Sequence, residues 1–301
     1  MATAQISLSG ILRAHQAWLA NSSEGRQADL NGLTLNDLDL TGAILSKAIL
    51  TRATLLDANL SGTNLAGCEM HRTDFQRANL AGADLTGATL HGADFAGAWL
   101  TGAALSETTM RQASFRRAKL ERVQMMGASV QASSFLDLDA DHANFHQSTF
   151  YDVDWSESRV RGAQFVHARF QHCRLVGMIA DESNWARTKL DHCHFASAEM
   201  DGAKLNNTEI IQCVFRDASL RNVDLRDAKI KGGDFARANL EGARFALATM
   251  TAVDFRGANL LGAREMTGSQ LMQVLTDNAT VLPNGKRGPY LRNSGAEKPA
   301  R

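Results

Sequence analysis

Four cysteines carry the most reactive side chains of this chain, and their spacing is regular. Cys173, Cys193 and Cys213 lie twenty residues apart, and Cys68 stands by itself. A thiolate can act as a nucleophile or bind a soft metal, but only where its pKa is lowered and solvent reaches it. No Cys-x-x-Cys pair occurs, and each cysteine occupies a position that the chain otherwise gives to small residues. We therefore interpret all four as free thiols that pack as small hydrophobic side chains.

Histidines form the second group with chemical potential, because six of the nine lie between His142 and His194. His172 and His192 are also separated by twenty residues, which predicts that they stack on one outer edge. A zinc site needs three or four ligands. No third and fourth ligand is clearly placed, since Asp152 and Asp191 read as ordinary solvated residues. We expect no metal and no cofactor, and a metal-dependent or unrecognised enzymatic site is the least favoured of the hypotheses below.

Sequence motifs and composition argue against several other functions. The chain has no nucleophile elbow, metalloprotease helix or glycine-rich phosphate loop, so we do not expect an enzyme. Its 32 Lys and Arg residues balance 32 Asp and Glu residues, and no net field draws it to nucleic acid or to an anionic membrane. No run of 18 apolar residues and no secretory signal is recognisable. The expected location is the cytoplasm, with no direct nucleic-acid or membrane partner.

A five-residue period organises most of the chain and must position all these side chains. Every fifth residue from Leu30 to Leu260 is apolar or Ala, without insertion or deletion. A smaller residue, most often Ala, stands two positions earlier, and the other three positions are mainly polar or Gly. In an extended segment, residues two apart point to the same side. Each pentapeptide is therefore predicted to form one short side, with the small and the large residue facing inward, followed by one corner where Gly supplies a positive φ.

The phenylalanines predict how many sides close one coil. All thirteen occupy the fifth-residue position, and eight share one phase at multiples of twenty residues. A twenty-residue period means four pentapeptides in each coil, with like residues stacked on successive coils. These eight are Phe75, Phe95, Phe115, Phe135, Phe195, Phe215, Phe235 and Phe255.

Segments such as 78–82 (Ala-Asn-Leu-Ala-Gly) and 83–87 (Ala-Asp-Leu-Thr-Gly) resemble the Ala-(Asp/Asn)-Leu-x-x signature of the pentapeptide-repeat protein family. The resemblance covers roughly three quarters of the chain. It implies an all-β solenoid, a right-handed four-sided parallel β-helix. At twenty residues a coil, the repeat would form about twelve coils, with short helical caps at both ends.

Open solenoid ends expose unpaired backbone and need covers. Residues 9–20 have apolar residues at helical spacing, and residues 267–276 contain a short apolar stretch after the period fails at Glu265. We predict an N-terminal capping helix in residues 1–25, the β-helix in 26–263, a C-terminal cap in 264–290 and a disordered tail in 291–301. Both flanks resemble those of bacterial members of the family. Leu271, Met272 and Leu275 can either seal the last coil or bridge two copies of the chain, so a homodimer through the C-terminal cap is open.

The segment 136–185 departs most from the regular pattern. Trp155 and Trp185 each share a coil with a small residue, Ala140 and Ala180 respectively. This predicts that the large indole ring fills the volume that the small side chain leaves within the coil. Apolar residues also stand at outward positions here and nearer the N-terminus. One interpretation is neutral variation at tolerant surface positions, and the other is a docking patch for a partner. The candidate partner-binding residues are Trp99, Leu136, Tyr151, Val166, Val176 and Ile179.

Two functions remain besides the enzymatic hypothesis. The favoured one is a non-enzymatic scaffold or adaptor that binds another protein through the outer faces of a rigid β-helix. The resemblance suggests a bacterial secretion or toxin-delivery system as its context, where it would serve as an adaptor, immunity protein or effector. The alternative is a DNA-mimicking protein that binds gyrase, a type II topoisomerase, as some family members do. That mechanism needs a strongly acidic surface, whereas residues 139–262 contain seventeen acidic and fifteen basic residues.

Overall fold

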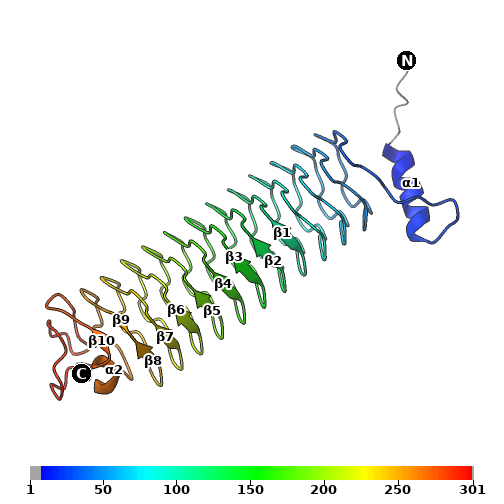
Figure 1. Cartoon of the computed structure of the whole chain (residues 1–301). Helices are drawn as coiled ribbons and strands as arrows, with labels where there is room; N and C mark the ends of the chain where they lie inside the picture. Colours follow the sequence, from blue (N-terminus) through cyan, green and yellow to red (C-terminus); the bar gives the residue numbers. More distant parts are fainter. Residues whose placement is uncertain (1–7, 300–301) are drawn as a thin grey trace. The chain divides into compact units, whose positions relative to one another are not determined.

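The computed structural model describes residues 8–299, which divide into two compact units at Ser134. Unit 1 ends with Ser134, and unit 2 begins with Phe135. Each unit is a stack of coils, drawn as successive turns of the chain in Figure 1.

One pentapeptide illustrates how the five-residue period becomes structure. In segment 78–82, Ala78 and Leu80 are fully buried, whereas Asn79 between them is partly exposed. The amide of Ala83 donates to the carbonyl of Leu80 at 3.0 Å, which closes a β-turn at the corner. Gly82 lies in the left-handed region with φ 64°. The predicted assignment of inward and outward positions is confirmed.

Successive coils pair with an offset of twenty residues, so each coil has four sides. Asn59 bridges Asn79 in parallel, and the Asn79 amide donates to the Ala58 carbonyl at 2.9 Å. The chain is a parallel β-solenoid, as predicted. We name the sides A to D in chain order by the buried residue at their centre. In one coil these are Leu190 (side A), Phe195 (side B), Met200 (side C) and Leu205 (side D), and residues twenty apart share a side.

Unit 1 contains helix α1 (Leu8–Leu19) and strands β1 (Thr109–Arg111) and β2 (Ser129–Gln131), which pair in parallel on side A. Its other sides, and its first coils, are joined by single-residue bridges. Phenylalanines stack inside side B as predicted: the ring centroids of Phe75 and Phe95 lie 4.8 Å apart, and those of Phe95 and Phe115 lie 4.7 Å apart.

Helix α1 contacts the first coil through a histidine. His15 is the only buried residue of the helix. Its Nδ1 accepts a hydrogen bond from the amide of Ala28, and its Nε2 donates to the carbonyl of Ser46, both at 3.0 Å. The helix ends at Leu19, and beyond it Asn21 lies in the left-handed region, with the Ser22 amide donating to the Ala17 carbonyl at 2.9 Å. The predicted apolar stripe on this helix is therefore only half-buried, because a polar side chain makes the central contact.

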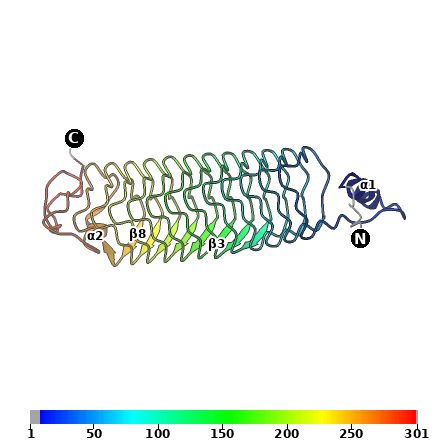
Figure 2. The ribbon, with the colours of Figure 1, turned by 90° about the horizontal axis from the view of Figure 1, so that it is seen from above.

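Unit 2 contains six parallel strands on side A, which appear as a row in Figure 2. Two short strands and helix α2 close its C-terminal end, where β9 pairs with β10. The elements are β3 (Thr149–Tyr151), β4 (Arg169–Gln171), β5 (Lys189–Asp191), β6 (Glu209–Ile211), β7 (Lys229–Lys231), β8 (Thr249–Thr251), β9 (Val253–Asp254), α2 (Gly268–Leu271) and β10 (Val274–Leu275).

The predicted count of about twelve coils needs correction to about eight turns. In the described residues, three-residue strands form in eight coils, β1 to β8. The reason is that the first coils of the repeat lack regular strands and are joined only by isolated bridges, such as Asp29 with Ile49 and Thr34 with Thr54. The five-residue period is the same in these coils as in the others, so the sequence alone does not show that they lack strands.

Large rings fill the interior of unit 2 where the sequence is least regular. The Trp155 ring centroid lies 4.4 Å from that of Phe135 and 5.1 Å from that of Phe150. Ala140 of the same region is fully buried. The indole nitrogen of Trp155 is buried without a hydrogen-bond partner among the described residues, whereas that of Trp185 donates to Ser183 Oγ at 2.7 Å.

The C-terminal cap closes the last coil of unit 2. Thr267 and Gln270 form a capping box at the start of α2, and the Gln270 side chain donates to the carbonyls of Phe245 and Ala248. Ala296 is buried, and its carbonyl accepts from the Asn284 amide at 3.2 Å. These contacts differ from the disordered tail that the sequence predicts from residue 291. The division of the chain into four segments stays a prediction.

Candidate functional site

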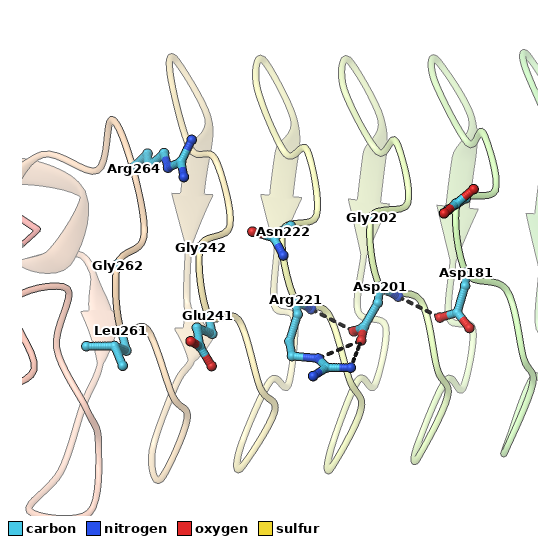
Figure 3. A pocket seen from close by; sticks show the side chains of 11 residues that line it. Asp181, Asp201, Gly202, Arg221, Asn222, Glu241, Gly242, Leu261, Gly262 and Arg264 are labelled. Carbon is cyan, nitrogen blue, oxygen red and sulfur yellow. Dashed lines mark hydrogen bonds and ion pairs between the residues drawn. The ribbon is translucent and has the colours of Figure 1, made fainter.

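A groove of about 830 Å³ runs along the corner between sides C and D of unit 2. Figure 3 shows it from close by, with its residues contributed by five successive coils. Each coil presents the two residues that follow the buried centre of side C. The lining consists of Asp181, Glu182, Asp201, Gly202, Arg221, Asn222, Glu241, Gly242, Leu261, Gly262 and Arg264.

Glycine leaves this corner open. Gly202, Gly242 and Gly262 occupy the left-handed corner position, with φ between 66° and 70°. The conformation does not by itself demand glycine, because Glu182 and Asn222 adopt it at the same corner with φ 57° and 55°. Arg, Asp and His side chains do so at other corners. The three glycines therefore remove side chains from the corner, and the backbone forms the floor of the groove.

Carboxylates on one wall are held in place by the next coil. The Asp201 amide donates to Asp181 Oδ1 at 3.0 Å, and the Arg221 amide donates to Asp201 Oδ1 at 2.9 Å. Ser219 Oγ and Arg221 Nε also donate to the Asp201 carboxylate, each at 2.6 Å. Figure 3 shows the Arg221 guanidinium turned toward Asp201. Because each carboxylate accepts a backbone bond, its position follows the coil spacing.

The ionisation of this wall follows from these contacts. Burial would raise the pKa of Asp201, but the hydrogen bonds from Ser219 and Arg221 outweigh it and lower the pKa. Arg221 is engaged by that carboxylate, and its own pKa is raised by the same contact. Asp181, Glu182 and Glu241 then share one further cation of the lining, Arg264, and outside the lining Arg161 Nε lies 3.8 Å from Asp181 Oδ2. The groove is therefore acidic at neutral pH and suits a positively charged, extended ligand.

The six candidate residues predicted from the sequence do not converge on one surface. In unit 1, Trp99 lies on side C between Asn79 and Lys119, with 62% of its surface exposed. In unit 2 the 20-residue register distributes the other five over all four sides. Tyr151 lies on side A, Leu136 and Val176 on side B, Ile179 on side C and Val166 on side D.

Only Tyr151 of those five exposes more than a third of its surface, at 41%, and its ring lies 5.8 Å from that of His172. Leu136, Val166, Val176 and Ile179 are partly buried. Their role in partner binding stays a prediction, and none of the six lines the groove. The sequence did not predict the groove, because the groove forms at corners where glycine has no side chain. Its signal was the recurrence of glycine in one corner phase, at 202, 242 and 262.

The cysteines and histidines occupy the positions that their spacing indicates. All four cysteines are free and buried. Burial raises the pKa of Cys68 to about 12 and also raises the pKa of Cys173 and Cys213. The rings of His172 and His192 are neighbours, with centroids 5.2 Å apart and planes tilted by 39°, and His192 Nδ1 lies 2.7 Å from Asp191 Oδ1. Within residues 8–299, no cluster of three or more His, Cys, Asp or Glu residues could hold a metal ion.

Comparison with known proteins defines the class. Three descriptions of pentapeptide repeats match the chain: "Pentapeptide repeats (8 copies)" over 26–55, 55–92, 141–177 and 168–207, "Pentapeptide repeats (9 copies)" over 75–119, and "Pentapeptide repeat region" over 188–264. The chain belongs to the pentapeptide-repeat proteins, as its sequence predicted. It is a repeat scaffold, and proteins of this family are generally structural or interaction proteins.

Solved structures show the same repeat in proteins of different origins. HetL, a pentapeptide-repeat protein involved in heterocyst differentiation regulation in Nostoc sp. strain PCC 7120, is 21% identical, with a TM-score of 0.33 and coverage of 93% of this chain and 98% of HetL. Full-length QnrB1, a plasmid-mediated fluoroquinolone resistance protein, is 17% identical, with a TM-score of 0.28 and coverage of 70% and 93%. Similarities at this level carry no functional inference. No curated protein sequence matches significantly.

Helix length also bears on function. Among residues 8–299, no helix is both long and apolar enough to cross a membrane.

Proposed function

We propose that unit 2 is a non-enzymatic docking scaffold that binds a protein partner along the groove between sides C and D. The observation that carries this proposal is the groove itself: a glycine floor beside carboxylates held by backbone hydrogen bonds. Preorganised charges reduce the ordering cost of binding. The partner contributes an extended segment with Lys or Arg side chains, which complement Asp181, Glu182 and Glu241.

Photo-crosslinking in the native cells tests this proposal. A photoreactive phenylalanine at position 202 places the probe on the groove floor, where an added Cβ meets nothing closer than Glu182 Cγ at 3.8 Å. The matched control places the same residue at Gly232, another left-handed corner outside the groove. We expect a discrete adduct from position 202 only.

Charge variants then test whether capture of the partner depends on the carboxylates of the groove. Glu182→Gln with Glu241→Gln removes two groove charges, and Asp152→Asn with Glu157→Gln removes two charges elsewhere in unit 2. Exposed ion pairs contribute about 0.2–1 kcal/mol each, so the groove variant should weaken capture about 2- to 30-fold while the control retains it. Identical adducts from both probe positions, or capture insensitive to the groove charges, would refute the proposal.

The gyrase-binding alternative is less favoured because the repeat lacks a large excess of carboxylates. Acidic and basic side chains nearly balance over residues 139–262, and mimicry of DNA requires an acidic surface over many base pairs. Recovery of gyrase subunits in the crosslinked adduct would favour it instead. The secretion or toxin-delivery context stays a prediction from the family resemblance.

Self-association through the C-terminal cap is a second arrangement with a specific observation in its favour. Leu271 is buried and seals the last coil, whereas Met272 and Leu275 are 53% and 56% exposed. These exposures support sealing by Leu271 and bridging by Met272 and Leu275. Met272→Ser with Leu275→Ser should convert a dimer to a monomer in light scattering while leaving the fold intact, and an unchanged mass would remove this arrangement.

A further inference from the structure

The first coil of unit 1 has a side that no described part of the chain covers. Helix α1 contacts this coil at Ala28 and Ser46, where its residue His15 is bound. On sides B and C, the inward side chains of Leu33 and Leu38 are 38% and 37% exposed. The residues at the same positions one coil later, Ala53 and Ala58, are fully buried. We call residues 33–41 the N-terminal ledge.

The backbone of the ledge has the hydrogen-bonding pattern of an open sheet edge. In the next coil, the equivalent amides of Thr54 and Asn59 donate to the carbonyls of Leu33 and Leu38 at 3.0 and 2.9 Å. Thr34 and Asp39 have no coil before them, and no acceptor for their amides is found among the described residues. Edges of this kind pair readily with another extended chain.

The pairing of the next coil provides the template for an added segment. Carbonyls of the next coil at Thr54 and Leu56 accept from the amides of Leu35 and Asp37. The ledge repeats this arrangement with no described residue paired above it, so an incoming segment that runs parallel to residues 33–41 continues the same ladder. Its inward side chains would then cover Leu33 and Leu38, as those of a preceding coil would.

The charge of the ledge identifies the kind of segment that fits. Asp37 and Asp39 are exposed, and no Lys or Arg lies between Ala28 and Ser46. The Thr41 hydroxyl and amide donate to Asp39 and lower the pKa of its carboxyl group, so it is ionised at neutral pH. A second copy docked edge to edge would place these carboxylates against each other, which is unfavourable.

We infer that the N-terminal ledge is a separate docking surface, which binds an extended segment of another polypeptide as an additional parallel strand. The segment supplies apolar side chains to Leu33 and Leu38 and Lys or Arg side chains to Asp37 and Asp39. Residues 1–7 of this chain contain no Lys or Arg and are therefore not the favoured occupant. The inference does not depend on the groove of unit 2.

A synthetic peptide that imitates two sides of a preceding coil tests this inference on the full chain. The probe is fluorescein-labelled (Ala-Lys-Leu-Lys-Gly) repeated twice, and its control carries Glu in place of Lys. Hydrogen exchange followed by NMR reports on the ledge directly, because strand addition protects the amides of Thr34 and Asp39. We expect the Lys peptide to slow both amides at least about tenfold at saturation and the Glu peptide to have no effect.

Three comparisons separate strand addition from other binding. N-methylation of the peptide backbone should abolish the protection, because it removes the donors that the ledge carbonyls need. Asp37→Asn with Asp39→Asn should weaken binding at least about fivefold in fluorescence anisotropy. The control, Asp74→Asn with Asp84→Asn, removes two carboxylates outside the ledge, both at the repeat position of Asp39, and should change affinity less than about twofold.

Several outcomes would overturn the inference. These are an absence of protection at Thr34 and Asp39, equal binding of the Lys and Glu peptides, or equal effects of the two pairs of Asp variants. A variant lacking residues 1–7 should bind as the full chain does. If binding arises only in that variant, the chain's own N-terminal segment is the occupant, and doubling of the mass on loss of Asp37 and Asp39 would favour a second copy.

Discussion

Replacing His15 should release helix α1 from the first coil without disturbing the later coils. The neutral imidazole satisfies two opposite partners: Nδ1 accepts from the Ala28 amide, and Nε2 donates to the Ser46 carbonyl, both at 3.0 Å. In His15→Ala both hydrogen bonds are lost, because alanine has no side-chain donor or acceptor. Each neutral hydrogen bond contributes about 0.5–1.5 kcal/mol net, so His15→Ala should cost about 1–3 kcal/mol in the docking of α1.

Hydrogen exchange measures this cost locally. Since 1.4 kcal/mol corresponds to a factor of ten, amides in the first coil that α1 protects, above all that of Ala28, should exchange about 5- to 150-fold faster in the variant. Amides of the regular strand β2 should not change, because they lie several coils away. Gln16→Ala is the matched control, since Gln16 is exposed on the same helix. Unchanged exchange at Ala28, or acceleration throughout unit 1, would refute the reasoning.

The same contact should depend on pH in a defined direction. Burial lowers the pKa of His15 below its ordinary value of 6.5, and the hydrogen bond with Ser46 only partly opposes this. The released helix therefore binds more protons than the docked one between the two pKa values. Docking is fully stable above about pH 6.5 and weakens as the pH falls below it, because a protonated Nδ1 would face the Ala28 amide with a second N–H. Exchange at Ala28 in the His15→Ala variant should lack this pH dependence once intrinsic exchange rates are corrected.

Three further predictions concern packing and charge in unit 2. Ala140→Leu should lower the free energy of unfolding by about 1–3 kcal/mol, because the site is fully buried beside large rings, and unchanged thermal stability would contradict the volume exchange. Trp185→Phe should cost about 1 kcal/mol more than Trp155→Phe in denaturant unfolding, because only Trp185 loses a hydrogen bond; equal costs would be unexpected. A double-mutant cycle on the exposed pair of Asp217 and Arg237 should give a coupling below about 1 kcal/mol that disappears in 1 M salt, and persistence in salt would count against simple ion pairing.

The period of the sequence determined the fold because each pentapeptide makes the same local choice. An inward pair of residues such as Ala78 and Leu80, followed by a corner, repeats without insertion. Spacings of twenty among phenylalanines and cysteines then revealed four sides, since stacked coils place like residues in contact. Burial of the cysteines and the proximity of the His172 and His192 rings followed from the same register.

Tertiary structure alone decided how helix α1 contacts the first coil and which surfaces are left open. The contact made by His15 could not be predicted from the sequence. A histidine among the apolar residues of a helix gives no indication of which two backbone groups it will bind. The sequence predicted one docking patch from six apolar residues at outward positions, yet the register distributes the five that lie in unit 2 over all four sides. The groove depends on the absence of a side chain at Gly202, and the ledge on the absence of a described coil above Leu38. The residue pattern does not show which of these absences leaves a surface open.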